Sequence, residues 1–155
     1  MTSYAPWDAD AARSIIAEKQ AMPGALLPIL HALQEEFGYI DRAAEPLIAE
    51  ILNLTRAEVH GVVTFYHDFR RTPPGRHILK LCRAEACQAM GADALALYAA
   101  QKTGIALGNT TGGISLEPVY CLGLCAVAPS AMFDGRVIGR LDTNMLDALV
   151  AEPDR

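Results

Sequence analysis

The sequence predicts an α+β protein in which a helical N-terminal region precedes an α/β C-terminal region. Apolar residues recur at helical spacing over about the first seventy positions, and short strand-like runs separated by a helical stretch follow. Between the two patterns, residues 70–76 (RRTPPGR) combine a Pro/Gly break with a charge cluster, for which a solvated linker is expected. The break divides the 155 residues into two predicted domains, 1–72 and 73–155.

Four helices are expected before the break. Asp8 or Asp10 suits the N-cap of the first, Gly38 the end of the second, and Asp41 the approach to the third. Residues 55–58 (TRAE) form a capping-box pattern for the fourth. The side chains expected to face inward are, helix by helix, Ala12, Ile15 and Ile16; Leu26, Leu30, Leu33 and Phe37; Leu47, Ile48, Ile51 and Leu52; and Val59, Val62, Val63 and Tyr66.

The third and fourth helices are short and closely joined, as in a DNA-binding helix-turn-helix. A recognition helix needs basic or amide side chains in its first turns, whereas this one offers Arg56, Glu58 and His60 in a chain with a net charge of -5 and a pI near 5.3. No nucleic-acid partner is therefore expected. The favoured interpretation is a small helical bundle that supports or docks the second domain.

The second domain is expected to follow the order β-α-β-β-β-α. The first strand covers residues 77–81, a helix covers 86–102, and a glycine-rich loop at 104–113 leads to a second strand at 114–120. Strands at 130–134 and 136–141 flank Asp134-Gly135, a strong hairpin signal, and Asp142 suits the N-cap of a last helix.

All four cysteines of the chain lie in this domain, as two close pairs. Four residues separate Cys82 from Cys87, and three separate Cys121 from Cys125. Each pair begins where a predicted parallel strand ends, so the two pairs are expected to meet at one edge of the sheet.

Three kinds of site use four paired cysteines. Disulfides suit small secreted domains, which this chain does not resemble. A zinc site takes cysteines two to four residues apart, and an iron–sulfur cluster also accepts wider spacings, so both metals stay open on spacing. The segment 119–133 (VYCLGLCAVAPSAMF) has no charged residue, and Gly123 allows a tight turn. An uncharged loop favours a redox centre that docks against a protein, the alternative being a buried crossover that only packs.

Two segments carry a family resemblance. GRHILKLCRAEACQAMGA and EPVYCLGLCAVAPSAMFDGRVIG resemble the thioredoxin-like 2Fe-2S ferredoxin subunit of NADH-oxidising complexes, and the upstream GVVTFYHDF resembles the segment before the linker in that family. The resemblance implies a thioredoxin-like fold, whose third strand often follows a cis-proline, so a cis bond is predicted at Pro129. By the resemblance, the ligands of the cluster, and hence of the metal, are Cys82, Cys87, Cys121 and Cys125.

The resemblance also implies a function. The protein is expected to be an electron-transfer subunit with one 2Fe-2S cluster, next to a partner subunit that binds FMN and NAD. No Gly-rich phosphate loop follows a strand of this chain, which fits cofactors held by the partner. The segment CRAEACQAMG and the short N-terminus are most similar to the gamma subunit of NAD-dependent formate dehydrogenase. The alternatives are the equivalent subunit of NADH-quinone oxidoreductase or of an NAD-reducing hydrogenase.

A different class stays open beside these, a zinc-stabilised protein-interaction module. The four histidines, His31, His60, His67 and His77, show no zinc-ligand spacing beside the cysteines. The first residues carry acids where a signal peptide carries cations, and no apolar run reaches the length of a membrane span. A cytoplasmic protein without direct membrane insertion is expected.

Overall fold

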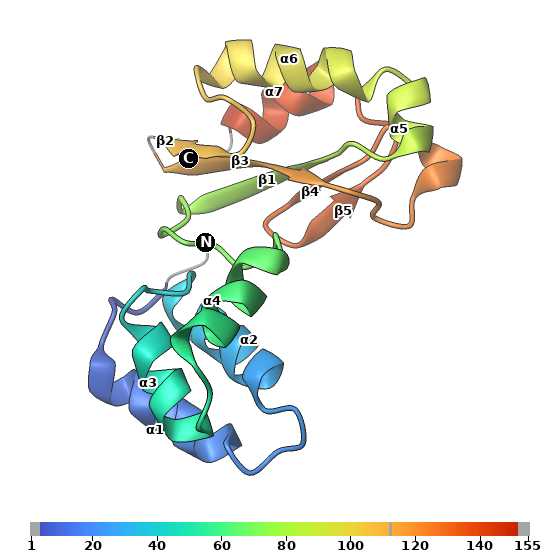
Figure 1. The fold of residues 1–155 in the computed structure, drawn as a ribbon. Helices are drawn as coiled ribbons and strands as arrows, with labels where there is room; N and C mark the ends of the chain where they lie inside the picture. Colours follow the sequence, from blue (N-terminus) through green and yellow to red (C-terminus); the bar gives the residue numbers. More distant parts are fainter. Residues whose placement is uncertain (1–3, 112, 152–155) are drawn as a thin grey trace. The chain divides into compact units, whose positions relative to one another are not determined.

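The computed structural model describes residues 4–111 and 113–151. Within them the chain forms two compact units, divided between Pro73 and Pro74 (Figure 1). The division supports the proposal that residues 1–72 and 73–155 are separate domains.

The N-terminal unit contains the four expected helices, α1 (Ala9–Lys19), α2 (Leu26–Phe37), α3 (Ala44–Leu52) and α4 (Arg56–Phe65). Local signals set their ends, as predicted. Asp8 caps α1 by accepting a hydrogen bond from the backbone N–H of Ala11, and Gly38 ends α2 with φ of 81°. The core of the unit consists of Ala12, Ile16, Ala25, Ile29, Leu30, Leu33, Phe37, Ile40, Ala44, Ile48, Ala49, Val59, Val63 and Phe69.

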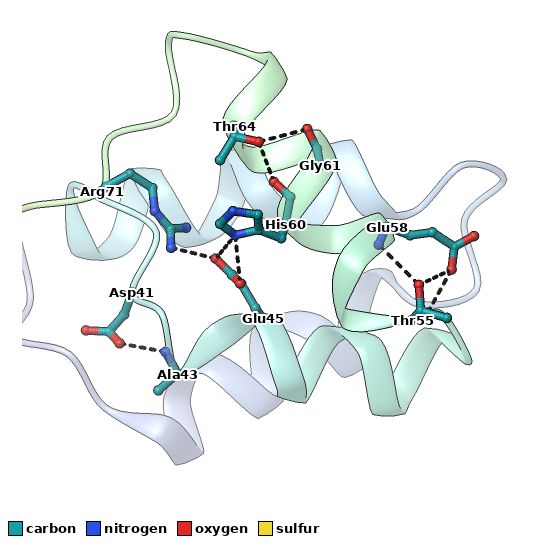
Figure 2. A network of polar contacts seen from close by, with 9 residues as sticks. All are labelled: Asp41, Ala43, Glu45, Thr55, Glu58, His60, Gly61, Thr64 and Arg71. Atoms are coloured by element: carbon teal, nitrogen blue, oxygen red, sulfur yellow. Dashed lines mark hydrogen bonds and ion pairs between the residues drawn. The ribbon is translucent and has the colours of Figure 1, made fainter.

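Polar contacts join α3, α4 and the segment before the second unit (Figure 2). The Glu45 carboxylate forms a 2.6 Å ion pair with Arg71, and His60 Nδ1 lies 3.3 Å from its second oxygen. The Gln34 side chain accepts a hydrogen bond from the Arg70 N–H and donates one to the Asp68 carbonyl. The expectation that these arginines belong to a solvated linker is therefore wrong, because residues 68–71 are bound to the helical unit.

One predicted core position is also wrong. Tyr66 is 44% exposed, since α4 ends at Phe65 and Tyr66 adopts an extended conformation, with φ of -89° and ψ of 104°. Once the helix has ended, helical spacing no longer sets the direction of a side chain.

The second unit is a five-stranded sheet in the order β2-β3-β1-β4-β5. Its strands are β1 (His77–Cys82), β2 (Asn109–Thr111), β3 (Ile114–Val119), β4 (Ala131–Phe133) and β5 (Arg136–Ile138). Only β1 and β3 are parallel, and the other neighbours within the described residues pair antiparallel. Helices α6 (Ala92–Thr103) and α7 (Thr143–Ala151) pack on one face of the sheet (Figure 1), over a core that includes Leu79, Leu81, Leu116, Leu146 and Leu149.

Two details of the predicted order differ from the structure. The helix expected at 86–102 is two helices, α5 (Glu85–Ala89) and α6, because Gly91 has φ of 89° and interrupts the helix. The loop expected at 104–113 contains the short strand β2, which forms an edge of the sheet.

The strand expected at 136–141 is shorter, because β5 ends at Ile138, whereas the expected hairpin turn, helix cap and cis-proline are present. Asp134 and Gly135 both have positive φ values, 47° and 83°, between β4 and β5, and Asp142 accepts a hydrogen bond from Met145 N–H at the start of α7. The Ala128–Pro129 bond is cis, which confirms the prediction. None of the helices in the described part of the chain has the length and apolar character of a membrane span.

Candidate metal centre

The four cysteines lie at one end of the sheet of the second unit. Cys82 is the last residue of β1, and Cys87 lies in α5; each is 2% exposed. Cys121 follows β3, and Cys125 begins a short 3₁₀ helix, η1 (Cys125–Val127); both are exposed. Figure 1 shows α5 and the loop after β3 at the same end of the sheet. All four thiols are free, so the structure contains no disulfide among them.

The parallel register of β1 and β3 brings the two pairs together. Cys82 lies opposite Val119, two residues before Cys121. The Cys87 side chain and the backbone of Cys121 both act on the Cys82 thiol, whose pKa they lower. In the second pair, the sulfurs of Cys121 and Cys125 are 3.6 Å apart. The segments that carry the two pairs therefore leave neighbouring parallel strands at the same edge of the sheet.

The loop that carries the exposed pair has an unusual backbone. Cys121 has φ of 92°, a value that residues with a side chain rarely adopt, and Gly123 has φ of 76°. This conformation directs the N–H of Gly123 to the Cys121 sulfur, at 3.4 Å. Strained backbone at a cysteine is typical of a functional site, and the N–H group stabilises negative charge on the sulfur.

The protein shifts the ionisation of two of these thiols. Burial is the largest influence on Cys82 and opposes its ionisation, but polar groups around the sulfur together lower its pKa: the backbone N–H of Ala84, the Cys87 side chain, the backbone of Cys121 and the Ser130 hydroxyl. The pKa of Cys125 is raised, mainly by its hydrogen bond and charge interaction with Cys121. Adjacent thiolates repel each other in this way unless a cation lies between them.

The donor set fits a metal centre of thiolate ligands. Two thiolates held by one tetrahedral ion at about 2.3 Å lie roughly 3.8 Å apart, close to the 3.6 Å between Cys121 and Cys125. Among the described residues, no three His, Cys, Asp or Glu side chains are placed to hold one metal ion together. Each iron of a two-iron cluster needs two protein sulfurs, and the Cys121–Cys125 distance suits one such iron.

Ser130 is part of this site although its sequence position did not indicate it. Its side chain is 2% exposed, and its hydroxyl oxygen lies 3.4 Å from the Cys87 sulfur. The only available signal was its place next to Pro129, at the start of a predicted strand. The pairing of β4 with β1 decides which sulfur the Ser130 hydroxyl contacts. Sequence patterns do not specify how far this hydroxyl lies from each cysteine.

Together, the sheet and the paired thiols define a small protein whose thiolates can hold a metal centre. The model of the family described as thioredoxin-like [2Fe-2S] ferredoxin matches residues 12–153. The chain belongs to this family, and it carries one 2Fe-2S cluster. The family decides between the two metals that spacing had left open, in favour of the iron–sulfur cluster over zinc.

Several known proteins are similar to this chain over most of its length. The NADP-reducing hydrogenase subunit HndA of Solidesulfovibrio fructosivorans is 30% identical over 145 residues, covering 90% of this chain and 85% of that protein. A subunit of the NADH-quinone oxidoreductase of Pseudomonas aeruginosa is 38% identical over 112 residues, with coverage of 71% and 68%. The crystal structure of an air-oxidised NAD+-reducing [NiFe]-hydrogenase aligns with a TM-score of 0.69 at 28% identity. That alignment covers 86% of this chain but only 23% of the hydrogenase chain.

Proposed function

We propose that this protein is the electron-transfer subunit of an NAD-linked oxidoreductase, with Cys82, Cys87, Cys121 and Cys125 as the ligands of its 2Fe-2S cluster. The convergence of the two cysteine pairs at one end of the sheet carries the assignment of ligands. The cluster supplies one-electron chemistry when bound. The chain contributes the thiolates, the N–H donors and the burial that set its environment.

The exposure of the sulfurs indicates which side of the cluster faces the partner subunit. Cys82 and Cys87 are buried, whereas Cys121 and Cys125 are exposed in a segment without charged residues. Tyr120, directly before Cys121, is 74% exposed. An uncharged surface with an exposed aromatic side chain suits contact with another protein. We place the partner subunit, which binds FMN and NAD, against this side of the cluster, so that electrons pass over a short distance.

The relatives favour two parent complexes. Similarity to an NADH-quinone oxidoreductase subunit and to hydrogenase chains supports the equivalent subunit of NADH-quinone oxidoreductase or of an NAD-reducing hydrogenase. The assignment to the gamma subunit of formate dehydrogenase, which rests on the segment CRAEACQAMG, is not among the functions these relatives name and stays a prediction. The cytoplasmic location also stays a prediction.

The ligand assignment is tested by purifying the protein anaerobically and measuring its absorption spectrum, iron and acid-labile sulfide. We expect two irons and two sulfides per chain. Replacing any one of the four cysteines by serine is expected to remove the cluster or greatly lower its occupancy, while circular dichroism still reports folded helices. The control is Ser14→Ala, at an exposed position on α1, which should keep full iron content. A colourless protein that contains zinc and no sulfide would refute the assignment.

The parent complex is tested by isolating the native complex through an affinity tag on this chain. The partners are identified by mass spectrometry, and the complex is assayed for NAD reduction with hydrogen or formate and for quinone reduction with NADH. Activity with formate alone would support the formate dehydrogenase prediction. Activity with hydrogen, or with NADH and quinone, would support the complexes that the relatives favour.

A further inference from the structure

Ser130 is a buried polar residue whose backbone position is fixed on two sides. Its carbonyl accepts a hydrogen bond from the backbone N–H of Cys82, at 3.0 Å, and the carbonyl of Pro129 before it accepts one from Leu141. The first bond continues the pairing of β1 with β4, in which Leu81 lies opposite Ala131, and the second ties the chain before β4 to the segment after β5. The Ser130 hydroxyl is therefore presented to the cysteines by the sheet and not by a mobile loop.

The contact between Ser130 and Cys87 has a defined direction once the cluster is bound. The hydroxyl oxygen and the sulfur are 3.4 Å apart, and either atom can donate while Cys87 is a thiol. A thiolate that binds iron has no proton and only accepts, whereas a serine hydroxyl can donate. The hydroxyl is then the donor, and both groups are shielded from water because each is 2% exposed. The same hydroxyl also favours ionisation of Cys82, but the sulfur that lies in hydrogen-bond geometry with it is that of Cys87.

We propose that Ser130 is a positioning residue that raises the reduction potential of the cluster by donating a hydrogen bond to the Cys87 sulfur. This inference rests on the proposed ligand role of Cys87. Reduction adds one electron, and therefore one negative charge, to the cluster and its thiolates. A donor at a ligand sulfur stabilises that added charge, and it does so more strongly where burial excludes water.

The experiment compares Ser130→Ala with the native chain by redox titration, followed through the electron paramagnetic resonance signal of the reduced cluster. We expect the alanine variant to shift the reduction equilibrium toward the oxidised cluster by up to about tenfold, which is 59 mV for one electron. Ser130→Thr keeps a hydroxyl, and its reduction potential is expected to lie close to that of the native chain.

A matched control is available in the same sheet. Ser115 is also fully buried, and its hydroxyl accepts a hydrogen bond from the Gly75 N–H and contacts Thr110, away from the cysteines. Ser115→Ala removes a buried hydroxyl just as Ser130→Ala does. It is expected to lower the unfolding free energy of the unit without changing the reduction potential of the cluster. The control therefore separates a general loss of stability from a local effect on the cluster.

A second measurement does not depend on threonine fitting the site. The resonance Raman bands of Fe–S(Cys) stretching are compared in native protein and in Ser130→Ala, each in H₂O and in D₂O. Loss of a donor is expected to raise a stretching frequency and to remove its isotope sensitivity. An alanine variant with full iron content, an unchanged potential and unchanged bands would overturn the inference while leaving the ligand assignment intact. A native protein that holds no cluster would instead overturn the assignment itself.

Discussion

Gly123 shows how a single residue shapes the cluster loop. It lies between Cys121 and Cys125 with φ of 76°, and a Cβ built there would meet no atom within 4 Å. The position therefore needs glycine for its backbone conformation and not for space. Its N–H donates to the Cys121 sulfur, so the conformation of the glycine and the environment of that sulfur are coupled.

Gly123→Ala is predicted to reduce cluster occupancy. The left-handed conformation costs a residue with a side chain about 1–2 kcal/mol, and relief of that cost would turn the N–H away from Cys121. Iron and sulfide content after anaerobic purification measures the effect. Gly135→Ala is the control, because Gly135 has φ of 83° and equally free space, but lies in the hairpin turn. Equal loss of iron in both variants would contradict the prediction.

Helix α4 is the element whose start is most completely specified. The Thr55 hydroxyl accepts a hydrogen bond from the Glu58 N–H, and the Glu58 carboxylate accepts from the N–H and hydroxyl of Thr55 (Figure 2). The first turn of a helix leaves backbone N–H groups without partners, and this reciprocal pair satisfies them. The cap also sets where α4 begins and so where Val59 and Val63 enter the core.

Thr55→Ala is predicted to lower the unfolding free energy of the helical unit by about 1 kcal/mol, because it removes the cap. Chemical denaturation followed by circular dichroism measures the change. Thr64 offers the matched control in the same helix, since its hydroxyl bonds back to the carbonyls of His60 and Gly61. Thr64→Ala is therefore expected to be neutral or slightly stabilising. A loss in the control as large as that in Thr55→Ala would argue against the capping explanation.

The same cap predicts a pH dependence. The pKa of Glu58 is lowered, first by the hydrogen bond from the Thr55 backbone and then by that from its hydroxyl. The carboxylate thus contributes stability that is complete above the pKa of an unfolded glutamate, about 4.3, and is lost as the pH falls from there through the lower folded value. Glu58→Gln should lose stability at pH 7 and show a smaller further loss than the native chain below about pH 4.3. Denaturation midpoints measured across this pH range check the prediction, and parallel curves for the two proteins would contradict it.

At the scale of the whole molecule, the segment between the two units is fixed at both of its ends. Residues 68–71 are bound to the helical unit through Gln34 and Glu45. The N–H of Gly75 donates to Ser115 in the second unit, where a Cβ on Gly75 would lie 2.6 Å from backbone atoms of Gly113. Only residues 72–74 lie between these anchors, and two of them are prolines.

Gln34→Ala is predicted to release the start of this segment. Its amide group bonds the backbone at both Asp68 and Arg70, and alanine removes both contacts. Hydrogen exchange of residues 68–71 should become at least about tenfold faster if the lost contacts contribute about 1.4 kcal/mol. Glu35→Ala changes the neighbouring, exposed position on α2 and should leave the exchange unchanged. Equal protection in Gln34→Ala and the native chain would show that the segment is held by other contacts.

Local patterns determined a large part of this protein. The caps at Asp8, Gly38 and Thr55, the hairpin at Asp134-Gly135 and the parallel strands that precede the two cysteine pairs were all predictable. Each depends on the preferences of a few neighbouring residues or on the fixed direction of parallel strands. The cysteine motif and its flanks were likewise sufficient to indicate the family.

Only the tertiary structure decided which sulfurs are buried, which hydroxyl touches them and what holds the segment before the second unit. Ser130, Gln34 and Arg71 looked like ordinary polar residues because their partners lie far away in sequence. The break at Gly91 and the edge strand β2 were also missed. Gly91 lies inside a run of helix-forming residues, and β2 is a strand only because it pairs with β3. Such contacts depend on distances between elements, and a local pattern specifies the element but not its neighbour.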